Sequence, residues 1–178
     1  MKIKNCLFLL GTAMAVMSSS AFADTTGTQT FTANVTANTC TIANLNQAVD
    51  LGNVLKADYV GLGNWHVPAN PSLVSVNFDV TGCGNNITTV NVTPAFTAES
   101  YIRFVKNTGT AAGIAFDTGK KSDADYDEKR IWENGKTKSF TLTNGGVQVP
   151  VIGALSKNAQ AVTAGTLDFQ MTFAFDFV

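Results

Sequence analysis

Residues 166–177 read TLDFQMTFAFDF, and this stretch decides which fold the chain can adopt. Side chains on a β-strand point alternately to opposite faces, so the stretch predicts a long strand with one continuous apolar face. A row of this kind left exposed would promote aggregation, and another part of a protein must therefore cover it. The pattern fits an ordinary central strand of a sandwich as well as a strand that lacks a neighbour. Its apolar positions are Leu167, Phe169, Met171, Phe173, Phe175 and Phe177.

The rest of the chain also consists of short alternating segments, and no long apolar run has a helical period. This pattern is typical of an all-β domain, and turn residues recur at the spacing of a β-sandwich. Asn144-Gly145 is one predicted tight turn, and Asn134-Gly135 predicts a hairpin that joins Ile131-Trp132 to residues 139–142. The other expected strands are 30–36, 48–54, 73–80, 88–96 with an interruption at Pro94, 101–105, 113–116 and 147–155. Residues 56–71 and 120–130 are expected to be loops, the second of them charged.

The first 23 residues have the pattern of a secretory signal peptide. Lys2 and Lys4 precede an apolar run over residues 7–16, and Ala21-Phe22-Ala23 provides small residues around a cleavage site. The apolar run is much shorter than the roughly 20 residues that a membrane span needs. We therefore expect an exported chain that begins at Asp24.

The chain has three cysteines, and Cys6 belongs to the predicted signal peptide. Cys40 and Cys83 remain as an even pair in an exported protein, for which a disulfide is the default expectation. Two cysteines and one distant histidine are too few ligands for a zinc site. The sequence therefore predicts a Cys40–Cys83 disulfide.

Neither charge nor catalytic residue types suggest an enzyme or a nucleic-acid-binding protein. The whole chain carries 12 basic and 13 acidic residues, and the signal peptide removes two of the basic ones. His66 is the only histidine, and nothing nominates a nucleophile and an orienting acid around it. Asp123, Asp125 and Asp127 have the spacing that opens a calcium loop, but Glu128 and Asn134 stand where an EF-hand needs Gly and Glu. We expect no catalytic site, no metal and no cofactor.

The segment between the cleavage site and Cys40 is polar and contains one short alternating run. Phe31 and Val35 share a face, with the small Ala33 between them. Such a segment is too isolated to fold alone, but it suits addition to the edge of a sheet, where alternate side chains fill pockets.

Taken in order, these marks resemble the pilin subunits of chaperone–usher fimbriae, especially the type 1-like group. The N-terminal block is FTANV (31–35), then CTI (40–42) and VDLGNV (49–54), and the middle mark is VNFDVTGC (76–83). The C-terminal mark is Gly165, which opens the alternating strand that ends with an aromatic residue at the penultimate position. Two positions depart from the family pattern, because Phe177 replaces the usual Tyr and Ala33 the usual Gly.

The resemblance implies an all-β, incomplete immunoglobulin-like β-sandwich that lacks its last strand and is completed by donor-strand exchange. It divides the chain into a signal peptide (1–23), an N-terminal extension that serves as donor strand (24–38) and a pilin domain (39–178). A periplasmic chaperone would first fill the groove, and at the outer-membrane usher the extension of the next subunit would replace it. The product would be a homopolymeric fimbrium on the cell surface that supports bacterial adhesion. The implied donor residues are Gly27, Gln29, Phe31, Ala33 and Val35, and the implied groove and chaperone contacts are Gly165, Leu167, Phe169, Met171, Phe173, Phe175 and Phe177.

A second hypothesis is that the subunit itself binds a host glycan or protein receptor. Tyr59, Trp65 and His66 lie in the long loop and are the candidate contacts for a sugar or a protein. Shaft, adaptor and terminator subunits share the marks quoted above, and a compact single domain suits a shaft subunit.

Overall fold

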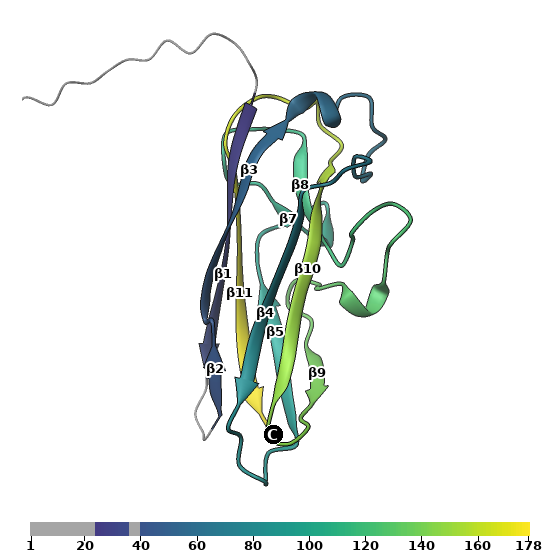
Figure 1. Ribbon diagram of the computed structural model, residues 1–178. Helices are drawn as coiled ribbons and strands as arrows, with labels where there is room; N and C mark the ends of the chain where they lie inside the picture. Colours follow the sequence, from purple (N-terminus) through teal and green to yellow (C-terminus); the bar gives the residue numbers. More distant parts are fainter. Residues whose placement is uncertain (1–23, 36–39) are drawn as a thin grey trace, which may run out of the picture.

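A computed structural model describes residues 24–35 and 40–178 as two β-sheets packed face to face (Figure 1). The signal peptide expected over residues 1–23 and the end of the extension, 36–38, lie outside the described residues. Short 3-10 turns form at η1 (Lys56–Asp58) and η2 (Glu128–Arg130). No helix among the described residues is long and apolar enough to cross a membrane.

One sheet has five strands in the order β3-β1-β11-β5-β9. Their bounds are β3 (Asn46–Leu55), β1 (Asp24–Val35), β11 (Leu167–Phe177), β5 (Thr89–Ala95) and β9 (Lys138–Thr141). The other sheet has six strands in the order β2-β4-β10-β8-β7-β6. Their bounds are β2 (Thr41–Ala43), β4 (Leu73–Thr81), β10 (Val147–Lys157), β8 (Ile114–Thr118), β7 (Tyr101–Lys106) and β6 (Ala98–Glu99).

The core lies between the two sheets and is rich in aromatic rings. The Phe173 ring on β11 lies 5.3 Å from Phe78 on β4 and 5.2 Å from Trp132, measured between ring centroids. Phe169 and Phe116 approach to 6.2 Å between the same two sheets. Tilted and edge-on pairs of this kind stabilise a core beyond the area that they bury. The apolar face of β11 therefore supplies one wall of the core.

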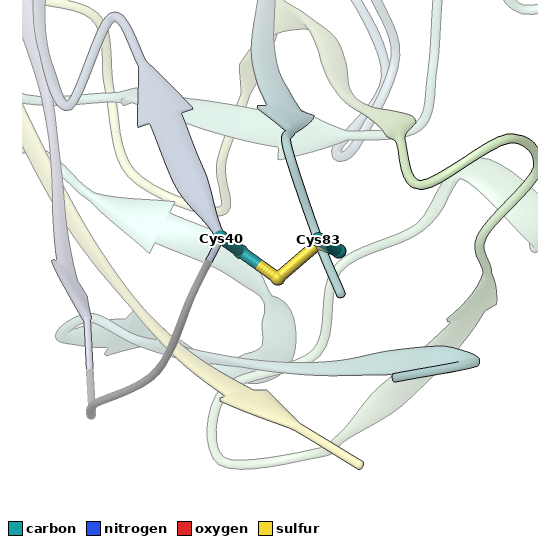
Figure 2. The surroundings of a disulfide bond; sticks show 2 residues. All are labelled: Cys40 and Cys83. Carbon is teal, nitrogen blue, oxygen red and sulfur yellow. A yellow bond between two sulfur atoms is a disulfide. The ribbon is translucent and has the colours of Figure 1, made fainter. Parts of the chain in front are cut away.

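The predicted disulfide between Cys40 and Cys83 is confirmed (Figure 2). It joins the residue before β2 to a residue just beyond the end of β4. The two cysteines are 43 residues apart in the sequence, so closing this loop is worth roughly 4 kcal/mol in the chain-entropy model. The bond therefore fixes the point at which the chain re-enters the sandwich after β1.

Two details of the sequence prediction are wrong. Asn134 and Gly135 do form a turn, but Ile131-Trp132 is not a strand, and β9 pairs with β5 instead. Trp132 is a core residue whose indole N–H donates to the Pro150 carbonyl at 3.0 Å. Pro94 does not interrupt its strand either, because β9 covers only residues 89–92 of β5 and the proline needs no N–H on that side.

Asp117 on β8 is a buried carboxylate whose loss of hydration is only weakly offset by contacts with other groups. Its side chain is fully buried, and neither of its oxygens has a hydrogen-bond partner. The Arg103 Nε atom is 3.5 Å from Oδ1, which is too far for a strong charge-assisted hydrogen bond. Burial raises the pKa of Asp117 to about 6, although the charges of Arg103 and Lys120 oppose the shift. The ionised form of this side chain therefore destabilises the fold.

This carboxylate predicts a pH dependence of stability. Because its folded pKa lies above its unfolded pKa, the folded chain binds the proton more tightly, and this contribution to stability is lost as pH rises from about 4 to about 6. Asp117→Asn removes the titration. The free energy of unfolding of the variant, minus that of the parent, should therefore increase by about 1–3 kcal/mol when the pH is raised from 4.5 to 7.5. Urea unfolding of both proteins at the two pH values measures this difference. A parent-to-variant difference that is equal at both pH values would contradict the assignment.

Candidate functional site

The apolar row of β11 is almost completely buried. Its first five members are between 0% and 2% exposed, and Phe177 at the end of the strand is half-buried. On one side β11 pairs antiparallel with β5, and on the other it pairs in parallel with β1. The strand is therefore central in its sheet, and the N-terminal segment of the same chain provides one of its two neighbours.

β1 lies between two strands and pairs with β3 over residues 24–32 and with β11 over residues 27–35. It runs antiparallel to the edge strand β3 and parallel to β11, in a register that places Gly27 opposite Leu167 and Val35 opposite Phe175. Figure 1 shows β1 lying along the length of β11. Without β1, the sheet would have a gap bounded by β3 and β11, which we call the β3–β11 groove.

Four described positions of β1 face the core, and they are a mixed set. Phe31 is fully buried, with its ring 6.4 Å from that of Phe173. Ala33 packs against the core, and Gly27 approaches so closely that a Cβ there would lie 2.9 Å from Leu167 Cβ. Gln29 is the fourth and is also fully buried. A single large apolar side chain in this set therefore anchors β1 in the groove.

Gln29 is the inward-facing residue of β1 whose burial is unfavourable. Its Oε1 atom has no hydrogen-bond partner, and its Nε2 atom has only the Met171 sulfur, at 4.0 Å. Leaving a buried polar atom unsatisfied costs about 1–3 kcal/mol. Gln29 therefore opposes the burial of β1 that Phe31 favours.

The outward face of β1 provides one further cross-strand contact. The hydroxyls of Thr32 and Thr172, which are register partners, lie 3.0 Å apart. This pair marks the parallel register on the solvent side of the sheet.

Gly165 precedes β11 where the backbone passes close to the loop before β8. Its φ is +156°, and a Cβ at this position would lie 2.4 Å from the Ala111 nitrogen. Only glycine fits such a close approach without displacing the backbone. The Thr166 and Asp168 carbonyls then accept hydrogen bonds from the backbone N–H groups of Ala111 and Thr108, at 3.0 Å and 2.8 Å. Tight backbone contacts thus fix the end of the groove at which β11 begins.

The structure brings the expected donor and groove residues together within one chain. Gly27, Gln29, Phe31 and Ala33 lie in the groove formed by their own subunit, and Val35 is placed by its backbone register alone. From the sequence, the extension is expected to fill the groove of the next subunit, and in the structure of the single chain it fills the groove of its own subunit. The physical reason is the otherwise unpaired edge of β11, with which the strand-forming segment of the same chain pairs. Donation to a neighbouring copy stays a prediction.

The three loop residues expected to contact a receptor have different environments. Tyr59 is 1% exposed, so it belongs to the core and cannot stack on a ligand; its burial, together with the charge of Asp58, raises the pKa of its hydroxyl. His66 is exposed, and its Nδ1 lies 2.8 Å from Asp123 Oδ2. Trp65 is half-buried against Phe104.

The charged loop is held in place by ion pairs. Asp123 binds Lys120 at 2.6 Å as well as His66, and it accepts a hydrogen bond from the Val67 N–H. Partial burial raises the pKa of Asp123, but these hydrogen bonds outweigh it and lower the pKa to about 2. Asp125 and Asp127 both pair with Arg130. Each of the three carboxylates thus has a cation of the protein as its partner, and no cluster of metal-binding side chains occurs among the described residues.

Two solved structures resemble this one along most of its length. The crystal structure of PapA, the rod subunit of the P pilus, superimposes with a TM-score of 0.61 and 16% identity and covers 79% of this chain and 100% of its own. An antigen and type I fimbria protein of Burkholderia pseudomallei gives a TM-score of 0.52 and 21% identity and covers 86% of this chain and 99% of its own. No protein-family model matches the sequence, and no curated protein matches it. The chain has the all-β, immunoglobulin-like fold of pilus subunits.

The unsatisfied amide of Gln29 predicts that a methionine at this position is stabilising. Gln29→Met keeps a similar length and removes the unpaired oxygen, so the free energy of unfolding should rise by about 1–3 kcal/mol. Thr28→Met at the exposed neighbouring position is the matched control and should change stability by less than about 0.5 kcal/mol. Urea denaturation of the parent and both variants measures these differences. Lower stability in Gln29→Met than in the control would show that the amide is satisfied in solution.

Proposed function

We propose that the chain is a structural subunit of a chaperone–usher fimbria that polymerises by donor-strand exchange and supports bacterial adhesion. The observation that carries the proposal is the position of β1, which lies between β3 and β11 and pairs along the open edge of β11. The fold shared with the P pilus rod subunit agrees with this function.

Exchange is physically simple because the same segment can fill the same groove from another copy. Swapping an identical element between copies conserves the contacts that it makes, so it is a low-cost route to assembly. A donor segment at one end of each subunit and a groove along another strand form a head-to-tail contact that does not close. Repetition of this contact generates a filament rather than a ring.

The chain connection explains the direction of β1 within its own groove. After Val35 the chain must return to Cys40, which the disulfide fixes beside the end of β4. β1 therefore runs parallel to β11. A segment donated by another copy is free of this tether and can enter the groove in either direction.

Before any strand fills the groove, the apolar row of β11 would be open to solvent along the side that β1 occupies. Five side chains that become at least 98% buried, each worth about 1.5–3 kcal/mol on burial, make an unprotected subunit prone to aggregate. This exposure is the reason to assign a periplasmic chaperone and an outer-membrane usher as partners. Neighbouring copies of the same subunit are the further partners, and the cell surface is the destination.

Moving the extension to the other end of the chain tests the proposal. Residues 24–38 are deleted from the N-terminus and joined after Val178 through a short flexible linker, so that they can fold back along β11. The fusion should melt at a higher temperature than the truncated chain that lacks the segment, because its groove is filled. It should form no fibres when expressed with the chaperone and the usher, because it has no segment left to donate.

The natural chain, expressed in the same way, is the positive control for fibres in electron micrographs. Fibres from the fusion at the level of the natural chain would show that the groove is not the polymerisation site. A fusion that melts no higher than the truncated chain would show that the segment does not complete the sheet.

A further inference from the structure

A pocket of about 580 Å³ lies beside β7, near the outer edge of the six-stranded sheet and away from the β3–β11 groove. Three segments that are distant in the sequence form it: the loop that contains Trp65, the strand β7, and the charged loop with the residues after it. Figure 1 shows both loops projecting from the same side of the sandwich. The volume is in the range of roughly 300–1,000 Å³ that small-molecule sites occupy.

Four aromatic residues line the pocket, and all but Phe104 are partly open to solvent. The Trp65 ring packs on the buried Phe104 and forms a T-shaped pair with Tyr101, with ring centroids 4.4 Å and 5.3 Å apart. Tyr101 is 57% exposed and Tyr126 is 41% exposed. The buried Phe104 thus supports Trp65, while the two tyrosines are the rings of the pocket most open to solvent.

Polar groups are fixed among these rings. The Arg103 guanidinium lies 4.6 Å from the ring centre of Phe104 and 4.9 Å from that of Tyr126, and it donates a hydrogen bond to the Tyr126 hydroxyl. The Glu133 carboxylate also lines the pocket and is 40% exposed. Cation–π contacts of this kind orient a guanidinium without using all of its donors. The pocket therefore combines ring faces with one cation and one carboxylate.

Backbone strain is concentrated at this pocket. Four non-glycine residues among those described have a positive φ, and two of the four, Trp65 at 69° and Ser100 at 47°, line the pocket. The strained turn at Trp65 is clamped on both sides. Its N–H donates to the Lys157 carbonyl at 2.6 Å, and its own carbonyl accepts from the Lys120 ammonium at 2.9 Å. Conformations of this kind persist where the surroundings enforce them, and they cluster at ligand sites.

We propose that this pocket binds a neutral saccharide unit. The C–H face of a pyranose ring packs against aromatic faces such as those of Tyr101 and Tyr126, and its hydroxyls accept from a guanidinium and donate to a carboxylate. One cation and one carboxylate leave no charge excess for an anionic or cationic ligand. An extended peptide would need a long free strand edge, whereas the outer strand β6 has two residues.

The site is independent of the polymerisation groove, so it is tested on the monomeric chain that begins at Asp24. The protein is applied to an array of immobilised neutral oligosaccharides, and the oligosaccharide bound best is then titrated in solution. The chain has two tryptophans, and Trp132 is 1% exposed in the core, so a saturable change in tryptophan fluorescence reports on Trp65.

Variants at Tyr101 separate a pocket-specific interaction from a general one. Tyr101→Ala should weaken binding at least tenfold, and Tyr101→Phe, which keeps the ring, should stay within about threefold of the parent. Leu73→Ala on β4 removes a similarly exposed apolar side chain outside the pocket and should leave affinity unchanged. The proposal is overturned if no oligosaccharide binds the parent above Tyr101→Ala, or if Leu73→Ala lowers affinity as much as Tyr101→Ala does.

Discussion

The whole five-stranded sheet depends on one constraint: the apolar row of β11 must have a strand on its open side. β1 meets this requirement from within the chain, and it also connects the edge strand β3 to the rest of the sheet. If β1 leaves, the core wall built by Phe169, Met171 and Phe173 is open on one side, and β3 loses its neighbour. The same constraint explains why the chain fills its own groove, and in the proposed exchange a segment from another copy takes the place of β1.

In the proposed exchange β1 must leave its own groove, and its inward face combines features that favour and oppose its burial there. Phe31 contributes a buried ring, Gly27 permits close approach, and Gln29 introduces an unsatisfied polar atom. A row of large apolar residues at these positions would bind more tightly and would also be harder to displace. The disulfide-fixed return at Cys40 sets the direction of β1 in its own subunit and places no such restriction on a donated segment.

Strong period-two alternation made most of the sandwich predictable, including β4, β10 and β11, and an even cysteine pair predicted the disulfide. The failures have physical causes. Ile131-Trp132 looked like a strand beside an Asn-Gly turn, yet the indole is large enough that core packing determines its position. Pro94 was tolerated because β9 ends before it. The two- and three-residue strands β6 and β2 are too short for any period. The pocket depends on Arg103 meeting Tyr126 across 23 residues, which no local pattern encodes.

The central claim is that β1 must leave its own groove before fibres can grow. A reversible disulfide between β1 and β11 tests this claim most directly. Thr32 and Thr172 are register partners with hydroxyls 3.0 Å apart, so Thr32→Cys with Thr172→Cys should form a disulfide that holds β1 in its own groove. The double Thr→Ser variant, treated with the same oxidant and reductant, controls for effects on the native disulfide. The account predicts that the oxidised cysteine variant stays monomeric and that reduction restores fibre growth, followed by sedimentation and electron microscopy. Fibre growth by the oxidised variant at the rate of the serine control would contradict it.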